Sequence, residues 1–237
     1  MPVAIMRKIF PKASKILKII SGSSYNSTRL ILSGKWPKWC VNQYLYSYGL
    51  VGLLLLASCK TDYENLPTFS AHKQLQVVIL TPAGSNHPQE YDSKTKTFVS
   101  TQEAGLPAKI NFLPLPGNLG FIPSTAIKHS GNNENEPLAA LVLAESVPSG
   151  TVMEVIPLGT LALNIAGEAR YIIIATPSRP TDQILAATDF NEFVTKYPAA
   201  KEIIQKWFLY HNPNQKTRLL GWKNDNETED LIRRWLK

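Results

Sequence analysis

The sequence lacks most of the short patterns that indicate a catalytic mechanism. It has no glycine-rich phosphate loop and no motif for Ser/His/Asp catalysis. None of its histidines has the spacing of metal ligands, and we interpret each as a surface or loop residue: His72, His87, His129 and His211. The sequence therefore gives no support for a phosphate-binding loop, a serine hydrolase or a histidine-based metal site.

Acidic residues are absent from the first 58 residues, which carry eight basic side chains. The rest of the chain holds 17 basic and 18 acidic residues, a net charge of −1, although all 237 residues together carry +7. The basic character thus belongs to the N-terminal segment alone. Because the remaining body is nearly neutral, we expect no nucleic-acid partner.

Long apolar runs are missing too. The run within residues 49–59, GLVGLLLLASC, spans about ten apolar residues, roughly half of what a membrane-crossing helix needs. A basic, acid-free stretch before a short apolar run is the layout of a secretory signal. Its ending, LASC, resembles the bacterial lipobox, which implies cleavage before Cys59 and attachment of a lipid to Cys59. A buried core strand that happens to end in cysteine is the alternative.

The positions of the two cysteines are consistent with export of the protein. Of the two cysteines, Cys40 would be removed with the leader and Cys59 would be acylated, so no disulfide would remain. We expect a lipoprotein held to a membrane through Cys59, on the periplasmic or cell-surface side. A leader of 58 residues exceeds the usual 15–30. Either its basic region is extended, or translation starts further downstream.

The remaining chain reads as a polar tether at 59–74 and a folded domain at 75–237. Short β-type runs are bounded by Pro, Gly or Asn, which predicts strands at 75–80, 139–144, 151–156, 159–163, 171–175 and 216–222. An apolar stripe from Asp189 to Phe208 predicts a helix capped by Thr188 or Asp189, and a second helix is expected over 227–235. The domain is therefore expected to be mainly β, a small barrel followed by packed helices.

Three stretches resemble family I soluble inorganic pyrophosphatases. Residues 116–123 read PGNLGFIP, residues 134–143 read ENEPLAALVL, and residues 148–159 read PSGTVMEVIPLG, in the order in which the family has them. The resemblance implies an OB-type five-stranded β-barrel with C-terminal helices. It also implies Mg²⁺-dependent hydrolysis of pyrophosphate, in which cations activate water and neutralise phosphate oxygens.

Most of the carboxylates that such a metal cage requires are replaced. The resemblance places the first two signature aspartates on Glu134 and Glu136 and the third on Ala139. Two further metal aspartates fall on Ile165 and Arg170. A glutamate is one methylene longer than an aspartate, which displaces its oxygens at a site intolerant of such shifts. An arginine in place of a ligand puts positive charge beside the cation's position.

The groups that would hold phosphate are depleted in the same way. Family positions with polar side chains fall here on Leu80, Leu115, Leu119, Ile172, His211 and Asn212. By resemblance, the compatible residues are Glu134 and Glu136 as metal ligands, Glu136, Asp92 and Lys109 as catalytic groups, and Asn118 as a substrate-binding group.

Three functional hypotheses follow. In the first, the fold is kept and hydrolysis is lost, because each lost group costs orders of magnitude in rate. In the second, Glu134, Glu136, Asp92 and Glu168 form a reduced site that binds Mg²⁺ and hydrolyses pyrophosphate slowly. In the third, the domain is a membrane-tethered binding or assembly protein. Its exposed aromatic residues would be Trp207, Phe208, Tyr210 and Trp222, although core packing is their simpler interpretation. An oligomer is compatible with each hypothesis.

Overall fold

The computed structural model describes residues 60–103, 105–128 and 135–237. The leader at 1–58, the lipidation candidate Cys59 and the metal-ligand candidate Glu134 lie outside these ranges. Among the helices of the described ranges, none is both long enough and apolar enough to cross a membrane.

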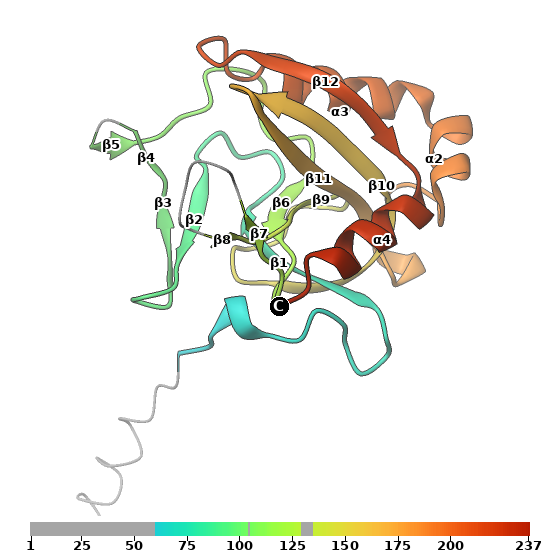
Figure 1. The fold of residues 1–237 in the computed structure, drawn as a ribbon, viewed down its shortest axis with the longest axis horizontal. Helices are drawn as coiled ribbons and strands as arrows, with labels where there is room; N and C mark the ends of the chain where they lie inside the picture. Colours follow the sequence, from blue (N-terminus) through green and yellow to red (C-terminus); the bar gives the residue numbers. More distant parts are fainter. Residues whose placement is uncertain (1–59, 104, 129–134) are drawn as a thin grey trace, which may run out of the picture. The chain divides into compact units, whose positions relative to one another are not determined.

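Five strands close into a ring, which confirms the predicted OB-type barrel (Figure 1). They are β1 (Leu75–Thr81), β6 (Asn118–Phe121), β9 (Ala139–Val142), β10 (Val152–Ile165) and β11 (Glu168–Pro177). The order is β1-β6-β9-β11-β10, and β10 pairs with β1 to complete the ring. Pairing is parallel between β9 and β11 and antiparallel elsewhere. The ring is uneven, because β10 and β11 have 14 and 10 residues whereas β6 and β9 have four.

Smaller elements extend the barrel. Strand β12 (Thr217–Lys223) pairs with the second half of β10. The remaining strands form three hairpin-like pairs: β2 (Gln89–Asp92) with β3 (Thr97–Ser100), β4 (Gln102–Glu103) with β5 (Leu106–Pro107), and β7 (Ile127–Lys128) with β8 (Asn135–Glu136). Short 3-10 helices lie at Tyr63–Asn65 and Pro180–Asp182.

Strand β10 corrects one sequence prediction. The runs 151–156 and 159–163 were expected to be separate strands because Pro157 and Gly159 stand between them. They form one strand, and the register with β11 shifts between Pro157 and Gly159. A bulge absorbs an extra residue and bends the strand without ending it. The bend lets the first half of β10 pair with β1 and the second half with β12.

The helices correct another prediction. The single apolar stripe after Asp189 comprises two helices, α2 (Phe190–Lys196) and α3 (Pro198–Tyr210). The break falls at Tyr197 (φ −130°, ψ 51°), because the ring of Pro198 disfavours helical geometry in the residue before it. Asp189 caps α2 by accepting a hydrogen bond from the Glu192 backbone, as predicted.

The last helix begins earlier than expected. Helix α4 (Asp225–Arg234) opens with a capping box in which Asn224 and Glu227 bond each other's backbone N–H. The sequence had placed its start at Glu227. The two basic residues of its last turn, Arg233 and Arg234, lie where they favour the helix dipole, as predicted.

Both faces of the central strands are buried, so their apolar runs are continuous. Along β11, Ile173 and Ala175 belong to a cluster that includes Leu231 and Ile232 of α4. The alternating residues Ile172 and Ile174 belong to a second cluster, with Phe193 of α2 and with Trp207 and Phe208 of α3. Successive residues of a strand face opposite sides, so helices cover both sides of this strand. Trp207 and Phe208 are core residues, as predicted, whereas the core prediction is wrong for Tyr210, which is 64% exposed.

The segment expected to be a tether is in contact with the domain over much of its described length. Thr68 is buried and donates its hydroxyl hydrogen to the carbonyl of Pro123. Tyr63 packs edge-on against Tyr91 and Phe98, with ring centroids 5.5 and 5.0 Å away. Its neighbour Leu66 accepts a hydrogen bond from Ser124. These contacts anchor the start of the described chain to the barrel.

Two residues of the PGNLGFIP stretch, Gly120 and Asn118, have structural roles in the barrel. A Cβ atom at Gly120 would lie 2.1 Å from the Val78 carbonyl oxygen, so β1 and β6 approach too closely there for any side chain. Asn118 is fully buried, and its Oδ1 accepts from the backbone of Ala83 and Val147. Its Nδ2 donates to the Glu145 carbonyl at 2.8 Å. Asn118 therefore joins two loops to β6, and the substrate-binding role proposed for it has no exposed polar atom to use.

Replacing Asn118 by alanine would leave these buried backbone groups without partners. We expect Asn118→Ala to lower the free energy of unfolding by about 3 kcal/mol, measured by urea denaturation. Asn191→Ala, an exposed position on α2, is the control and should stay within about 0.5 kcal/mol of the wild type. Equal stabilities of the two variants would contradict the structural role of Asn118.

Candidate functional site

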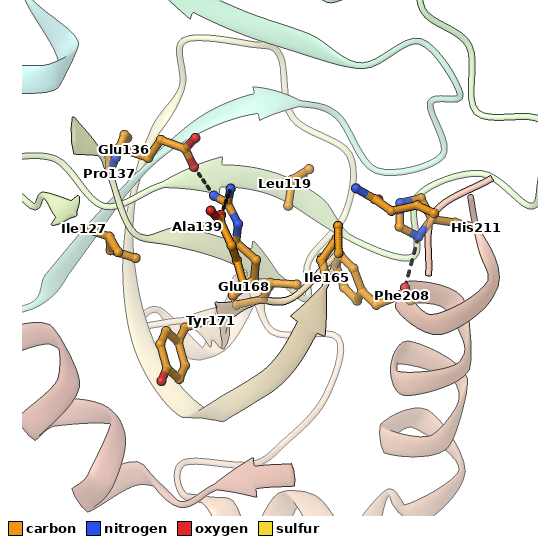
Figure 2. A pocket seen from close by; sticks show the side chains of 14 residues that line it. Leu119, Ile127, Glu136, Pro137, Ala139, Ile165, Glu168, Tyr171, Phe208 and His211 are labelled. Atoms are coloured by element: carbon orange, nitrogen blue, oxygen red, sulfur yellow. Dashed lines mark hydrogen bonds and ion pairs between the residues drawn. The ribbon is translucent and has the colours of Figure 1, made fainter. Parts of the chain in front are cut away.

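A cavity of about 530 Å³ opens between the barrel and the C-terminal end of α3 (Figure 2). Strands β6, β8, β9, β10 and β11 contribute to its walls. It is lined by Leu119, Ile127, Glu136, Pro137, Ala139, Ile165, Ala166, Glu168, Arg170, Tyr171, Ile172, Phe208, His211 and Gln215. The structure thus brings together seven of the positions to which the sequence resemblance had assigned family functions: Leu119, Glu136, Ala139, Ile165, Arg170, Ile172 and His211.

The charged residues lie at one end of the cavity. Arg170 of β11 bonds Glu136 of β8 through Nη1, and through Nη2 it contacts Glu168 Oε2 at 3.1 Å (Figure 2). Glu168 and Arg170 are two apart on one strand and therefore share a face. The three side chains are 31–45% exposed, so water partly screens their interaction.

This arrangement follows from the parallel pairing of β9 with β11. Ala139 of β9 is the register partner of Ile172 of β11. Glu136 lies three residues before Ala139, and Arg170 lies two before Ile172, so both reach the same end of the strand pair. The positive guanidinium therefore lies between Glu136, which the family resemblance associates with metal binding, and Glu168.

Apolar side chains form the middle of the cavity. Leu119, Ala139 and Ile165 come from three different strands, and Figure 2 shows Ile165 facing Phe208 of α3. Leu119, Ala139 and Ile165 pack at the edge of the core cluster that contains Ile172 and Phe208. The side chains of Leu119, Ala139 and Ile165 carry no polar group that could hold a phosphate oxygen.

His211 lies at the opposite end from the charged residues. Its ring stacks on Trp207 with centroids 4.5 Å apart, and its Nδ1 lies 3.2 Å from the Phe208 carbonyl oxygen. Burial lowers the pKa of His211 below its ordinary value, because the charged form loses hydration. The imidazole is therefore neutral at neutral pH and adds no positive charge to the cavity.

Two predicted catalytic residues lie elsewhere. Asp92 ends β2, and its carboxylate accepts hydrogen bonds from the backbone of Lys94 and Thr95 and from the Thr95 hydroxyl. These bonds, chiefly that from the Thr95 hydroxyl, lower the pKa of Asp92. Lys109 is exposed on the loop before β6. Neither residue lines the cavity. Of the described candidates, Glu136 and Glu168 line it, whereas Asn118 is fully buried and held by its hydrogen bonds.

The described residues do not fit a magnesium ion. Hard cations need several oxygen ligands in tight geometry. Within residues 60–103, 105–128 and 135–237, no group of three or more His, Cys, Asp or Glu side chains could hold a metal. Glu136 and Glu168 both bond Arg170, and the hydrocarbon side chains of Ala139 and Ile165 offer no ligand atom.

From the sequence, Arg170 was recognised as standing in the place of a family aspartate. Its ion pairs with Glu136 and Glu168 were not predicted. The two-residue spacing of Glu168 and Arg170, just before the strand predicted at 171–175, was the available signal for half of this group. The other half depends on strand pairing, which no local pattern shows. Tyr171, Ile127 and Gln215 also line the cavity without having been singled out.

Comparisons with known proteins agree with the fold. Residues 77–237 match the family model for inorganic pyrophosphatase. The inorganic pyrophosphatase of Thermus thermophilus superposes with a TM-score of 0.60 at 22% identity, covering 73% of this chain and 95% of that one. The Helicobacter pylori enzyme gives 0.60 at 20%, covering 73% and 96%. The type I enzyme of Toxoplasma gondii gives 0.64 at 16%, covering 74% and 85%. A comparison with curated proteins gives no match.

The structural matches cover 95% and 96% of the two bacterial chains. In those proteins the barrel and its helices therefore make up nearly the whole chain. These matches establish the fold, and the family model covers more than half of the sequence. The chain belongs to the inorganic pyrophosphatase family.

Proposed function

We propose that this member of the inorganic pyrophosphatase family has lost the metal-dependent hydrolysis of pyrophosphate. The observation that carries the proposal is the position of Arg170 between Glu136 and Glu168. A guanidinium has no acceptor atom and stays protonated, so it neither ligates a cation nor activates water. It supplies a fixed positive charge where the family reaction needs an exchangeable divalent ion.

Electrostatics opposes metal binding beside this group. Two unit charges 4 Å apart interact by about 1 kcal/mol in water and about 4 kcal/mol near a protein surface, and a divalent ion doubles the repulsion. Both described carboxylates already gain from Arg170, so a cation would have to displace it. Ala139 and Ile165 provide no compensating ligand.

The alternative of a slow diphosphatase with a reduced metal site has less support. It relies on Glu134, Glu136, Glu168 and Asp92 acting together. Asp92 stabilises the turn between β2 and β3 and lies outside the cavity lining. The remaining three carboxylates would have to bind Mg²⁺ in competition with Arg170.

Phosphate release tests the loss of hydrolysis directly. Residues 60–237, incubated with pyrophosphate over a range of Mg²⁺ and Mn²⁺ concentrations, should release phosphate no faster than the double variant Glu134→Ala/Glu136→Ala. Removal of several cooperating groups costs about 10² to 10³ each in catalytic rate, which leaves little to measure. Metal-dependent release that disappears in the double variant would contradict the proposal and identify these glutamates as a working cage.

Replacing the arginine by a carboxylate should restore cation binding. In Arg170→Asp three acidic side chains would meet, so we expect a lower melting temperature without metal and a rise of about 3–6 °C with Mn²⁺ at ten times its dissociation constant. Arg218→Asp, an exposed position on β12, has the same charge change and should show no such rise. Equal Mn²⁺ stabilisation of the wild type would show that Arg170 does not replace the cation.

We also propose that the domain is held at a membrane by a lipid on Cys59, on the evidence of the LASC ending and the acid-free basic leader. In a bacterial host, the full chain should sediment with membranes, and the N-terminal peptide of the mature protein should carry a diacylglycerol on Cys59 by mass spectrometry. The variant Cys59→Ser should leave that peptide unmodified. Wild-type protein that is soluble and unmodified would contradict the anchor.

A further inference from the structure

The chain that follows the proposed lipidation site is bonded to the domain almost from its first described residue. The carbonyl oxygen of Thr61 accepts a hydrogen bond from the Tyr91 hydroxyl at 3.1 Å, and the backbone N–H of Tyr63 donates to the same hydroxyl oxygen at 3.3 Å. Between them, the carboxylate of Asp62 lies 3.3 Å from Nζ of Lys96. Three consecutive residues are therefore held by β2 and by the turn at 93–96 that joins β2 to β3.

Aromatic packing adds to this attachment. The ring of Tyr63 packs edge-on against the rings of Tyr91 and Phe98, which belong to β2 and β3. Tyr91 in turn stacks beside Phe121 of β6, with ring centroids 6.3 Å apart. Aromatic pairs of this kind stabilise a structure beyond the burial of their apolar surface. The N-terminal segment is thus connected through the β2–β3 hairpin to a strand of the barrel.

The free chain between the proposed anchor and the domain is consequently very short. A flexible coil over residues 59–74 would span about 20 Å on average. Instead, only Lys60 separates Cys59 from the bonded Thr61. Because consecutive Cα atoms are about 3.8 Å apart, the Cα atom of Cys59 lies no more than about 8 Å from that of Thr61. A lipid on Cys59 would therefore hold this face of the domain close to the bilayer.

So short a link also restricts how the domain is oriented. A body tied to a plane at one surface point approaches the plane with the face that carries this point, because other orientations would place part of the body inside the plane. The same face carries the β2–β3 turn, since Lys60 donates from Nζ to the Thr95 carbonyl oxygen at 2.9 Å (Figure 1). The exposed side chains of the turn, Ser93, Lys94 and Thr95, are polar, which suits the head-group layer and not the hydrocarbon core.

We propose that the docked N-terminal segment holds the domain directly against the lipid head groups of a membrane, with the β2–β3 turn facing the bilayer. This inference rests on the proposed lipid at Cys59 and adds the orientation of the domain to it.

Quenching of site-specific fluorophores tests this orientation. The full-length protein is expressed in a bacterial host, and its mature form is placed in vesicles of phosphatidylethanolamine and phosphatidylglycerol. With Cys40 removed and Cys59 acylated, an introduced cysteine is the one free thiol. Ser93→Cys labels the β2–β3 turn, and Asn214→Cys labels the loop between α3 and β12; both positions are exposed, and these segments lie far apart in Figure 1.

Nitroxide on the lipid head groups should quench the label at 93 at least about twofold more strongly than the label at 214, because a link of two residues keeps the turn at the surface. Equal quenching of the two labels would overturn the inference, since a domain on a free tether turns in all directions.

A longer link tests the cause of the orientation. Insertion of about 16 Gly/Ser residues between Lys60 and Thr61 lengthens the free chain to about 20 Å on average and should bring the ratio of the two quenching values close to one. The double variant Asp62→Ala/Tyr63→Ala removes the ion pair and the ring contacts and should lower the ratio without lengthening the chain. Phe69→Ala, which removes an exposed ring further along the same segment, is the control and should keep the wild-type ratio. An unchanged ratio after the insertion would overturn the role of the docked segment.

Mass spectrometry of the same preparation separates this inference from the proposed anchor. An unmodified Cys59 would overturn both. A diacylglycerol on Cys59 with equal quenching at 93 and 214 would overturn the orientation alone. A diacylglycerol on Cys59 with stronger quenching at 93, lost on insertion of the Gly/Ser linker, would support both.

Discussion

Strand β10 is the constraint on which the rest of the domain depends. Its first half pairs with β1 and closes the barrel, its second half pairs with β12, and β11 pairs along nearly its whole length. The bulge at Pro157–Gly159 bends β10 between its two halves, so that one half can pair with β1 and the other with β12. Each of the five barrel strands has strand partners on both sides over part of its length, and β12 ends the sheet beside β10.

Packing explains two residues of the barrel, whereas the described lining of the cavity offers few groups that could bind metal or phosphate. Gly120 permits the close contact of β1 and β6, and Asn118 satisfies buried backbone groups of two loops. Selection on packing alone would preserve both. The cavity, by contrast, combines hydrocarbon walls with one arginine shared between two glutamates. A guanidinium between two carboxylates reduces their mutual repulsion.

Sequence reasoning located most elements and failed where distant parts of the chain interact. Strand positions followed from β-branched runs bounded by turn residues, and the cap of α2 from Asp189. Pro198 was a local signal for a break in the helix. The apolar periodicity continued across it, however, and favoured a single helix. The hydrogen bonds of Asp92 and Asn118 were not predicted, because family position says nothing about which hydrogen bonds a side chain makes in this particular chain.

Residue identity and local periodicity determined, from the sequence alone, the family resemblance, the order of strands and helices along the chain, and the lack of ligand atoms in the side chains of Ala139 and Ile165. These are properties of single positions or short windows. Only the tertiary structure decided that Arg170 lies between Glu136 and Glu168. Glu136 is 34 residues away from Arg170 in sequence, and the two meet because β9 and β11 pair in parallel, in a register that depends on the whole closed sheet.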